Sequence, residues 1–97
     1  MRMVDVTGKD RTVRVATADG YVQTTTAVVD LITGNDTPKG DVLAAARLAA
    51  IMAVKRTPDL IPLCHPISIG GVDVDITASG NRVNLRVLVK TTDRTGV

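Results

Sequence analysis

The sequence predicts a single α+β domain in which helices cover one face of an antiparallel sheet. Stretches with alternating apolar and polar residues lie at 12–24 and 67–90, and they indicate strands. Two helical segments lie between them, over 27–32 and 42–56. Strands grouped before and after helices are typical of α+β domains. The length of 97 residues allows one small domain, spanning residues 1–97.

The first stretch is expected to be a β-hairpin. Residues 12–18 alternate in polarity, Asp19 and Gly20 form a strong two-residue turn signal, and residues 21–24 would return antiparallel. A threonine among residues 24–26 would then cap the short helix, which Gly34 is placed to end.

The long helix has an unusual surface. Asp41 is its expected N-cap, the helix runs from Val42 through Arg56, and Thr57-Pro58 stops it. Between Val42 and Val54 the only charged residue is Arg47, and a helix that is apolar all round is normally covered on all sides. We therefore expect an oligomer, whose second layer could approach closely over the small residues Ala44, Ala45, Ala46, Ala49, Ala50 and Ala53. The alternative is a helix enclosed within a larger domain of which this chain is part.

A second hairpin is expected after the long helix. Residues 67–77 and 83–90 alternate in polarity, with a turn at 79–81 and a bulge at Gly70-Gly71. Residues 91–97 are polar and add no closing element, so the helical cover of the sheet is expected to be incomplete.

Composition narrows the classes of function. The formal net charge is +2 and the sequence pI is near 9.0, but the basic residues are scattered and Tyr21 is the only aromatic residue, which disfavours nucleic-acid binding. A small anionic substrate is compatible with this charge. Cys64 is the only cysteine, and the sequence shows neither a signal peptide nor an apolar run near 20 residues. We therefore expect a cytoplasmic protein with no membrane segment.

The stretch 59–66 is the first candidate site. It holds the only histidine, His65, beside Cys64 and between Pro62 and Pro66. The prolines stiffen the backbone and so aim the imidazole, which titrates near neutrality. The alternatives are a structural histidine and a simply buried cysteine. A metal site is disfavoured because no second Cys or His is present, and a Cys–His nucleophilic pair is disfavoured because adjacent side chains point apart.

The turn formed by residues 38–41 is the second candidate. Lys39 precedes the long helix, whose free N–H groups could join its ammonium in holding a phosphate or carboxylate. The spacing does not match a phosphate-binding P-loop. The alternative is an ordinary solvated lysine.

Five short motifs together resemble the MoaC family, the cyclic pyranopterin monophosphate synthases of molybdenum cofactor biosynthesis. The match runs over essentially the whole chain, and the Leu-Cys-His-Pro and Lys-Gly-Asp-Val motifs are specific in combination. The motifs are Met3-Val4-Asp5-Val6, Lys39-Gly40-Asp41-Val42, Ala53-Val54-Lys55-Arg56-Thr57, the stretch 59–66 and Thr95-Gly96-Val97.

The resemblance implies a ferredoxin-like fold assembled as a homohexamer, with active sites between subunits. The family converts a cyclised dihydro-GTP, made by an upstream radical GTP cyclase, to cyclic pyranopterin monophosphate and pyrophosphate. Lys39 would contact phosphate or transfer protons, and Leu63, Cys64 and His65 would form a substrate-binding segment in which His65 is the catalytic partner. The resemblance implies no resident cofactor and leaves open whether a divalent metal accompanies the triphosphate.

This sequence also departs from the family pattern. The family chain continues after Thr-Gly-Val into Glu-Met-Glu, a further helix, a catalytic aspartate and a second lysine, which have no counterpart here, and this sequence contains no glutamate. We therefore expect the N-terminal portion of the family domain, either as a fragment or as a natural short form. The alternative to an enzyme is a catalytically incomplete oligomerisation or nucleotide-binding module.

Overall fold

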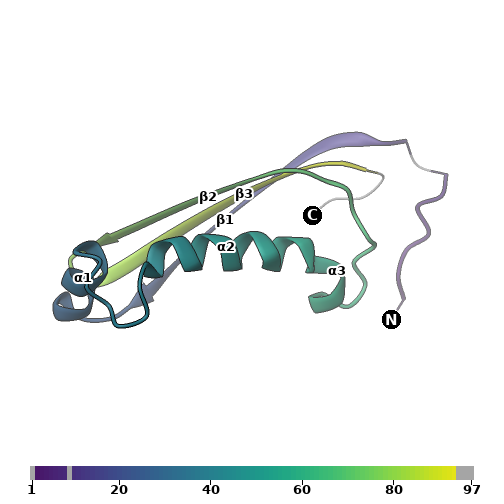
Figure 1. Cartoon of the computed structure of the whole chain (residues 1–97). Helices are drawn as coiled ribbons and strands as arrows, with labels where there is room; N and C mark the ends of the chain where they lie inside the picture. Colours follow the sequence, from purple (N-terminus) through teal and green to yellow (C-terminus); the bar gives the residue numbers. More distant parts are fainter. Residues whose placement is uncertain (1, 9, 94–97) are drawn as a thin grey trace.

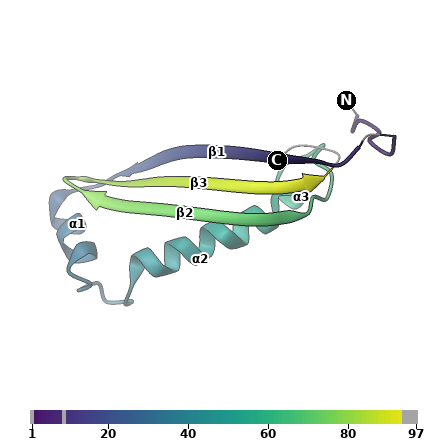
Figure 2. The same cartoon turned by 90° about the horizontal axis from the view of Figure 1, so that it is seen from above.

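The described fold is a three-stranded antiparallel sheet with all its helices on one side. The computed structural model describes residues 2–8 and 10–93, and only these are considered below. Figure 1 shows the helices beneath the sheet, and Figure 2 shows the strands side by side in the order β1, β3, β2. The elements in chain order are β1 (Thr12–Gln23), α1 (Thr26–Thr33), α2 (Val42–Lys55), α3 (Thr57–Leu60), β2 (Ile69–Ser79) and β3 (Arg82–Asp93).

The first strand is continuous, and the hairpin predicted at Asp19-Gly20 is wrong. β1 pairs antiparallel with β3 along all of its 12 residues. β3 is equally long, so a continuous β1 can form backbone hydrogen bonds with β3 along its whole length. A turn at residues 19 and 20 would have left part of β3 without these partners. Asp19 lies opposite Arg86 within this ladder and accepts a hydrogen bond from its Nε at 2.6 Å. The expected order of two strands, two helices and two strands is therefore wrong in its first part.

The second hairpin is confirmed. β2 and β3 pair antiparallel around a turn in which Gly80 has a φ of +63°, a value that favours glycine. The pairing register shifts between Ile69 and Gly71, which confirms the predicted bulge. β3 extends past the predicted end at residue 90 to Asp93. The motif at residues 95–97 lies outside the described residues.

Side-chain caps fix the starts of the two main helices. The hydroxyl of Thr25 accepts a hydrogen bond from the Val28 N–H at 3.2 Å, and the carboxylate of Asp41 accepts one from the Ala44 N–H at 2.9 Å. Such caps satisfy backbone donors that have no partner within the helix. Both predicted N-caps are therefore confirmed, and Gly34 is the C-cap of α1, as expected.

A short helix that the sequence did not predict follows α2. α2 ends at Lys55 with Arg56 as its C-cap, and α3 begins at once at Thr57. Pro58 stops α2 as predicted, but proline is tolerated in the first turn of a helix, so the chain resumes as the one-turn α3. No helix in the described part of the chain is long and apolar enough to cross a membrane.

The hydrophobic core lies between the helices and the β2–β3 side of the sheet. Its buried apolar residues are Val29, Ile76 and Val89. α2 packs on β2, and α1 packs on β2 and β3. α2 has no buried residue, and Leu48 and Met52 on it are 60% and 51% exposed. The result is an α+β, ferredoxin-like arrangement in which the helical cover over β1 is incomplete, as predicted.

Candidate functional site

The loop between α3 and β2, residues 61–68, holds three of the four predicted site residues. It turns sharply, because the Cys64 N–H donates to the carbonyl oxygen of Ile61 at 3.2 Å. Its far end is tied to the sheet by a 2.9 Å hydrogen bond from the Ser68 N–H to the carboxylate of Asp93. The loop therefore has an internal turn at its start and an anchor to the sheet at its end.

Leu63 occupies a strained backbone conformation in this loop. Its φ is +86°, and its side chain is 48% exposed. For a bulky residue other than glycine this conformation is an outlier that costs about 1–3 kcal/mol. Strain of this kind concentrates at functional sites.

The strain at Leu63 leads to a stability prediction. Leu63→Val should destabilise the protein by about 1–2 kcal/mol, because a β-branched side chain tolerates positive φ even less well. Leu63→Gly should leave the free energy of unfolding within about 1 kcal/mol of wild type, because relief of the strain offsets the lost side-chain burial. Urea unfolding of the two variants measures both effects. A glycine variant less stable than the valine variant would show that the leucine side chain, not its backbone conformation, dominates.

Cys64 and His65 are both half-buried. The Cys64 thiol donates to the carbonyl oxygen of His65, with the sulfur 3.3 Å away. The thiol is therefore directed at the backbone and not at the imidazole. Among the described residues no hydrogen bond supports a Cys–His nucleophilic pair. Nor does any group of three His, Cys, Asp or Glu side chains in the described ranges have the geometry to hold a metal ion.

Asp5 is a charged residue of the N-terminal segment to which the sequence analysis assigned no role. Its carboxylate accepts hydrogen bonds from the Thr7 N–H at 3.0 Å and the Thr7 hydroxyl at 2.7 Å. These two bonds, and a smaller attraction from His65, hold the pKa of Asp5 below its usual value. The Met3-Val4-Asp5-Val6 motif thus lies within electrostatic reach of the histidine segment.

Lys39 is exposed in the turn that precedes α2. The turn is closed by a hydrogen bond from the Gly40 N–H to the Thr37 carbonyl oxygen at 3.1 Å and by one from the Thr37 hydroxyl to the Gly40 carbonyl oxygen. Gly40 has a φ of +93°, so glycine is needed at this position. The ammonium of Lys39 is therefore carried on a defined turn at the positive end of the helix dipole.

The structure does not bring Lys39 and His65 together within one chain. Lys39 lies just before the N-terminus of α2, and His65 follows α3 beyond its C-terminus. The 14 residues of α2 separate the two loops by about 21 Å of helix. Figure 1 shows the α1–α2 connection and the α3–β2 loop at opposite ends of the molecule.

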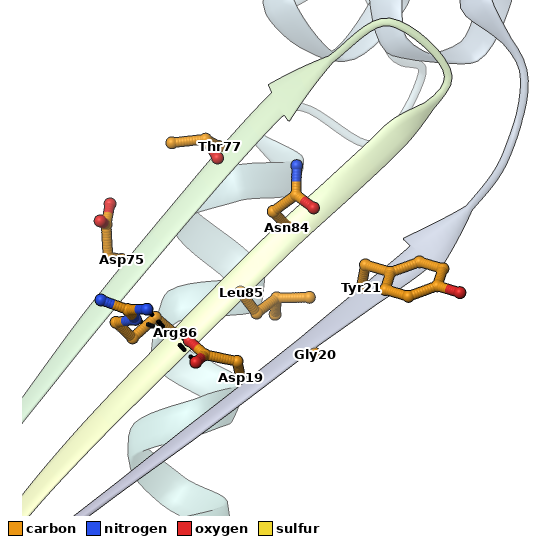
Figure 3. Close-up of a pocket in the computed structure, with 8 residues that line it drawn as sticks. All are labelled: Asp19, Gly20, Tyr21, Asp75, Thr77, Asn84, Leu85 and Arg86. Carbon is orange, nitrogen blue, oxygen red and sulfur yellow. Dashed lines mark hydrogen bonds and ion pairs between the residues drawn. The ribbon is translucent and has the colours of Figure 1, made fainter.

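Two surface hollows lie elsewhere, and neither is lined by a predicted site residue. One, of about 400 Å³, lies on the sheet face turned away from α2 and is polar (Figure 3). Its lining includes Asp19, Tyr21, Asp75, Thr77, Asn84 and Arg86. The other, of about 490 Å³, lies between α2 and the strands β1 and β3. Its lining includes Ala16, Ala18, Ala50, Ala53, Val87 and Val89.

Two of the three charged side chains that line the polar hollow, Asp19 and Arg86, form an ion pair. Arg86 donates to both carboxylate oxygens of Asp19, at 2.6 and 3.3 Å, across the β1–β3 pair (Figure 3). This bond lowers the pKa of Asp19 and raises that of Arg86. Both side chains are exposed. The guanidinium of Arg82 stacks over the Tyr21 ring, 4.3 Å from its centroid. This hollow therefore has the character of a polar sheet face held by cross-strand pairs.

The Asp19–Arg86 pair predicts a pH dependence of stability. Because the pKa of Asp19 is lowered in the folded protein, the pair stabilises the fold above the unfolded-state pKa, and this contribution is lost as the pH falls through the folded-state pKa. Asp19→Asn should therefore lower the melting temperature at pH 7 and leave it nearly unchanged near pH 2. The comparison variant is Asp73→Asn, for which no ion pair occurs among the described residues. An Asp19→Asn effect of equal size at both pH values would contradict the prediction.

Comparison with known proteins identifies the family. The model of the MoaC family matches residues 3–97. This chain belongs to the MoaC family. A cyclic pyranopterin monophosphate synthase of Streptomyces avermitilis is 57% identical over 96 residues, which are 99% of this chain and 56% of the relative. A protein of the same name in a Nocardioides species is 58% identical, over 99% of this chain and 61% of the relative. A cyclic pyranopterin monophosphate synthase 2 of Mycobacterium tuberculosis is 53% identical, over 98% of this chain and 57% of the relative. The chain spans little more than half the length of these relatives.

Proposed function

We propose that this MoaC-family chain supplies part of a lyase, a cyclic pyranopterin monophosphate synthase of molybdenum cofactor biosynthesis. The reaction converts 3',8-cyclo-7,8-dihydroguanosine triphosphate, the product of a radical GTP cyclase, to cyclic pyranopterin monophosphate and pyrophosphate. The observation that carries this proposal is the match of nearly the whole chain, at more than 50% identity, to relatives of that name.

The chemistry of the two loops fits this substrate. An exposed ammonium at the start of a helix suits a triphosphate, and we assign that contact to Lys39. Ring opening and closing require groups that exchange protons near neutral pH, and we assign this role to the imidazole of His65. Leu63 and Cys64 would shape the surface against which the substrate lies. Any divalent metal would arrive with the triphosphate.

We further propose that each active site is formed between copies of the chain. Lys39 and His65 lie at opposite ends of α2, so one chain cannot direct both at one small substrate. The apolar surface of α2, with Leu48 and Met52 exposed, supports a homo-oligomer, for which the family hexamer is our model. The single free cysteine supports the cytoplasm as the compartment.

A second candidate function is a catalytically incomplete oligomerisation or nucleotide-binding module. This candidate is favoured by the limited part of the relatives that the chain matches, because more than two fifths of the Streptomyces avermitilis relative lies outside the match. Such a module would self-associate or bind a nucleotide through Lys39 without turning it over.

A coupled assay separates the two candidates. The assay supplies GTP, the upstream radical enzyme and either the 97-residue chain or a chimera that joins it to the unmatched part of the Streptomyces avermitilis relative. We expect product from the chimera and little or none from the chain alone. A chimera that binds nucleotide but makes no product, while the relative is active in the same assay, would favour the non-catalytic module.

A further inference from the structure

The direction of the His65 side chain depends on the backbone of its loop. Within residues 2–8 and 10–93 the imidazole of His65 makes no hydrogen bond. The Cys64 thiol donates to the carbonyl oxygen of His65, so it holds the backbone and not the ring. Pro66 fixes its own φ and favours an extended conformation at His65. Where the imidazole lies is therefore set by the points at which the loop backbone is held.

The end of the loop is held by a side chain of β3. β2 begins at Ile69, which lies opposite Thr91, while β3 continues to Asp93. Before Ile69 the pairing with β3 stops, and the N–H of Ser68 donates instead to the carboxylate of Asp93 at 2.9 Å. A hydrogen bond to a carboxylate is stronger than one between neutral groups. Asp93 therefore extends the attachment of this chain segment to β3 by one residue.

The anchor stands on a packed part of the sheet. Thr91, two residues before Asp93 on β3, is 1% exposed. Two residues separate His65 from Ser68, so the Cα atoms of His65 and Ser68 are at most about 11 Å apart. A group supported by a packed strand positions its neighbours more precisely than a loop does alone. The bond from Ser68 to Asp93 thus limits the positions that His65 can reach.

We propose that Asp93 is a positioning residue for His65, because its carboxylate holds the Ser68 N–H and thereby keeps the imidazole directed at the substrate. The inference rests on the proposed function for the role of His65, but the bond itself is measured without turnover. Because Asp93 acts through the backbone, loss of its acceptor should slow the chemical step more than it weakens substrate binding. Lys39, to which we assign the phosphate contact, lies at the other end of α2.

Kinetics of the chimeric synthase test this role. Asp93→Ala should lower kcat at least tenfold and change KM less than threefold, because the imidazole is present but misdirected. Asp93→Asn should keep kcat within about threefold of wild type, because the amide oxygen accepts the same hydrogen bond. Asp73→Ala removes the same charge from an exposed position on β2, and it should leave both constants unchanged.

The single histidine of the chain allows a second measurement that needs no turnover. In the 97-residue chain the Ser68 amide proton should exchange at least tenfold more slowly than an unstructured amide, and Asp93→Ala should remove this protection. The order parameter of the Cδ2–Hδ2 bond of the His65 ring, measured by carbon relaxation, should fall in Asp93→Ala and recover in Asp93→Asn. Circular dichroism checks that the variants are folded.

The outcomes separate this inference from the proposed function. A wild-type chimera that makes no product would overturn the proposed function, and the measurements on the chain alone would still decide whether Asp93 holds the histidine loop. The role of Asp93 is overturned if the Ser68 amide exchanges freely in the wild-type chain, a result that does not depend on the folding of any variant. It is also overturned if Asp93→Ala leaves ring motion and kcat unchanged, if Asp73→Ala lowers kcat as much, or if Asp93→Asn is as slow as Asp93→Ala.

Discussion

Lys39→Ala and His65→Ala should each lower turnover of the chimeric synthase by at least about a hundredfold, because each removes a group that contacts phosphate or moves a proton. Neither variant should lose stability, since Lys39 is exposed and His65 lies in a surface loop. A second expected result concerns the activity of a mixture of the two inactive variants. Co-assembled in equal amounts, they should regain about a quarter of wild-type activity if each site combines Lys39 of one copy with His65 of another.

The recovery follows from counting sites in a two-fold pair. Half of the pairs are mixed, and each mixed pair holds one site with both native side chains and one site with neither. Lys90→Ala, on the opposite side of the sheet from the helices, is the matched control and should retain activity. If Lys39→Ala and His65→Ala both retained turnover, the assignment of these residues to the active site would be wrong. Loss without recovery on mixing would show that both residues of a site come from the same copy.

The distance between the two candidate loops could not be predicted from the spacing of their motifs in the sequence. The stiffness predicted for the histidine loop follows from local chemistry, because proline fixes its own φ wherever it occurs. The distance between Lys39 and His65 depends instead on the straight course of α2, and the weak electrostatic effect of His65 on Asp5 depends on how the chain folds. Local sequence carries little information on either.

The fold shows the same division between local and distant determinants. The N-caps at Thr25 and Asp41 and the bulge near Gly71 were predictable because each involves residues close in sequence. Asp19-Gly20 has the local signature of a turn, but pairing with β3, more than sixty residues away, holds it in a strand. α3 was missed because a proline that ends one helix can also begin the next.

The sparse core makes the stability of this domain depend on a few side chains. Ile76 is 6% exposed on β2, the strand on which both main helices pack. Ile76→Ala should destabilise the domain by about 2–5 kcal/mol, because it removes buried methyl groups and leaves a cavity. Domains of this length are typically stable by about 5–15 kcal/mol. The substitution should therefore lower the urea midpoint strongly or leave the chain partly unfolded at room temperature.

Two further variants separate core packing from other effects at Ile76. Ile76→Val should cost only about 0.5–1.5 kcal/mol, since it removes a single methylene group from the same position. Val15→Ala, on an exposed residue of β1, should cost less than about 0.5 kcal/mol. A loss at Val15 as large as that at Ile76 would show that the outer sheet face is buried in the assembled protein. The helix-side core would then not be the main source of stability, because the interface between copies would share that role.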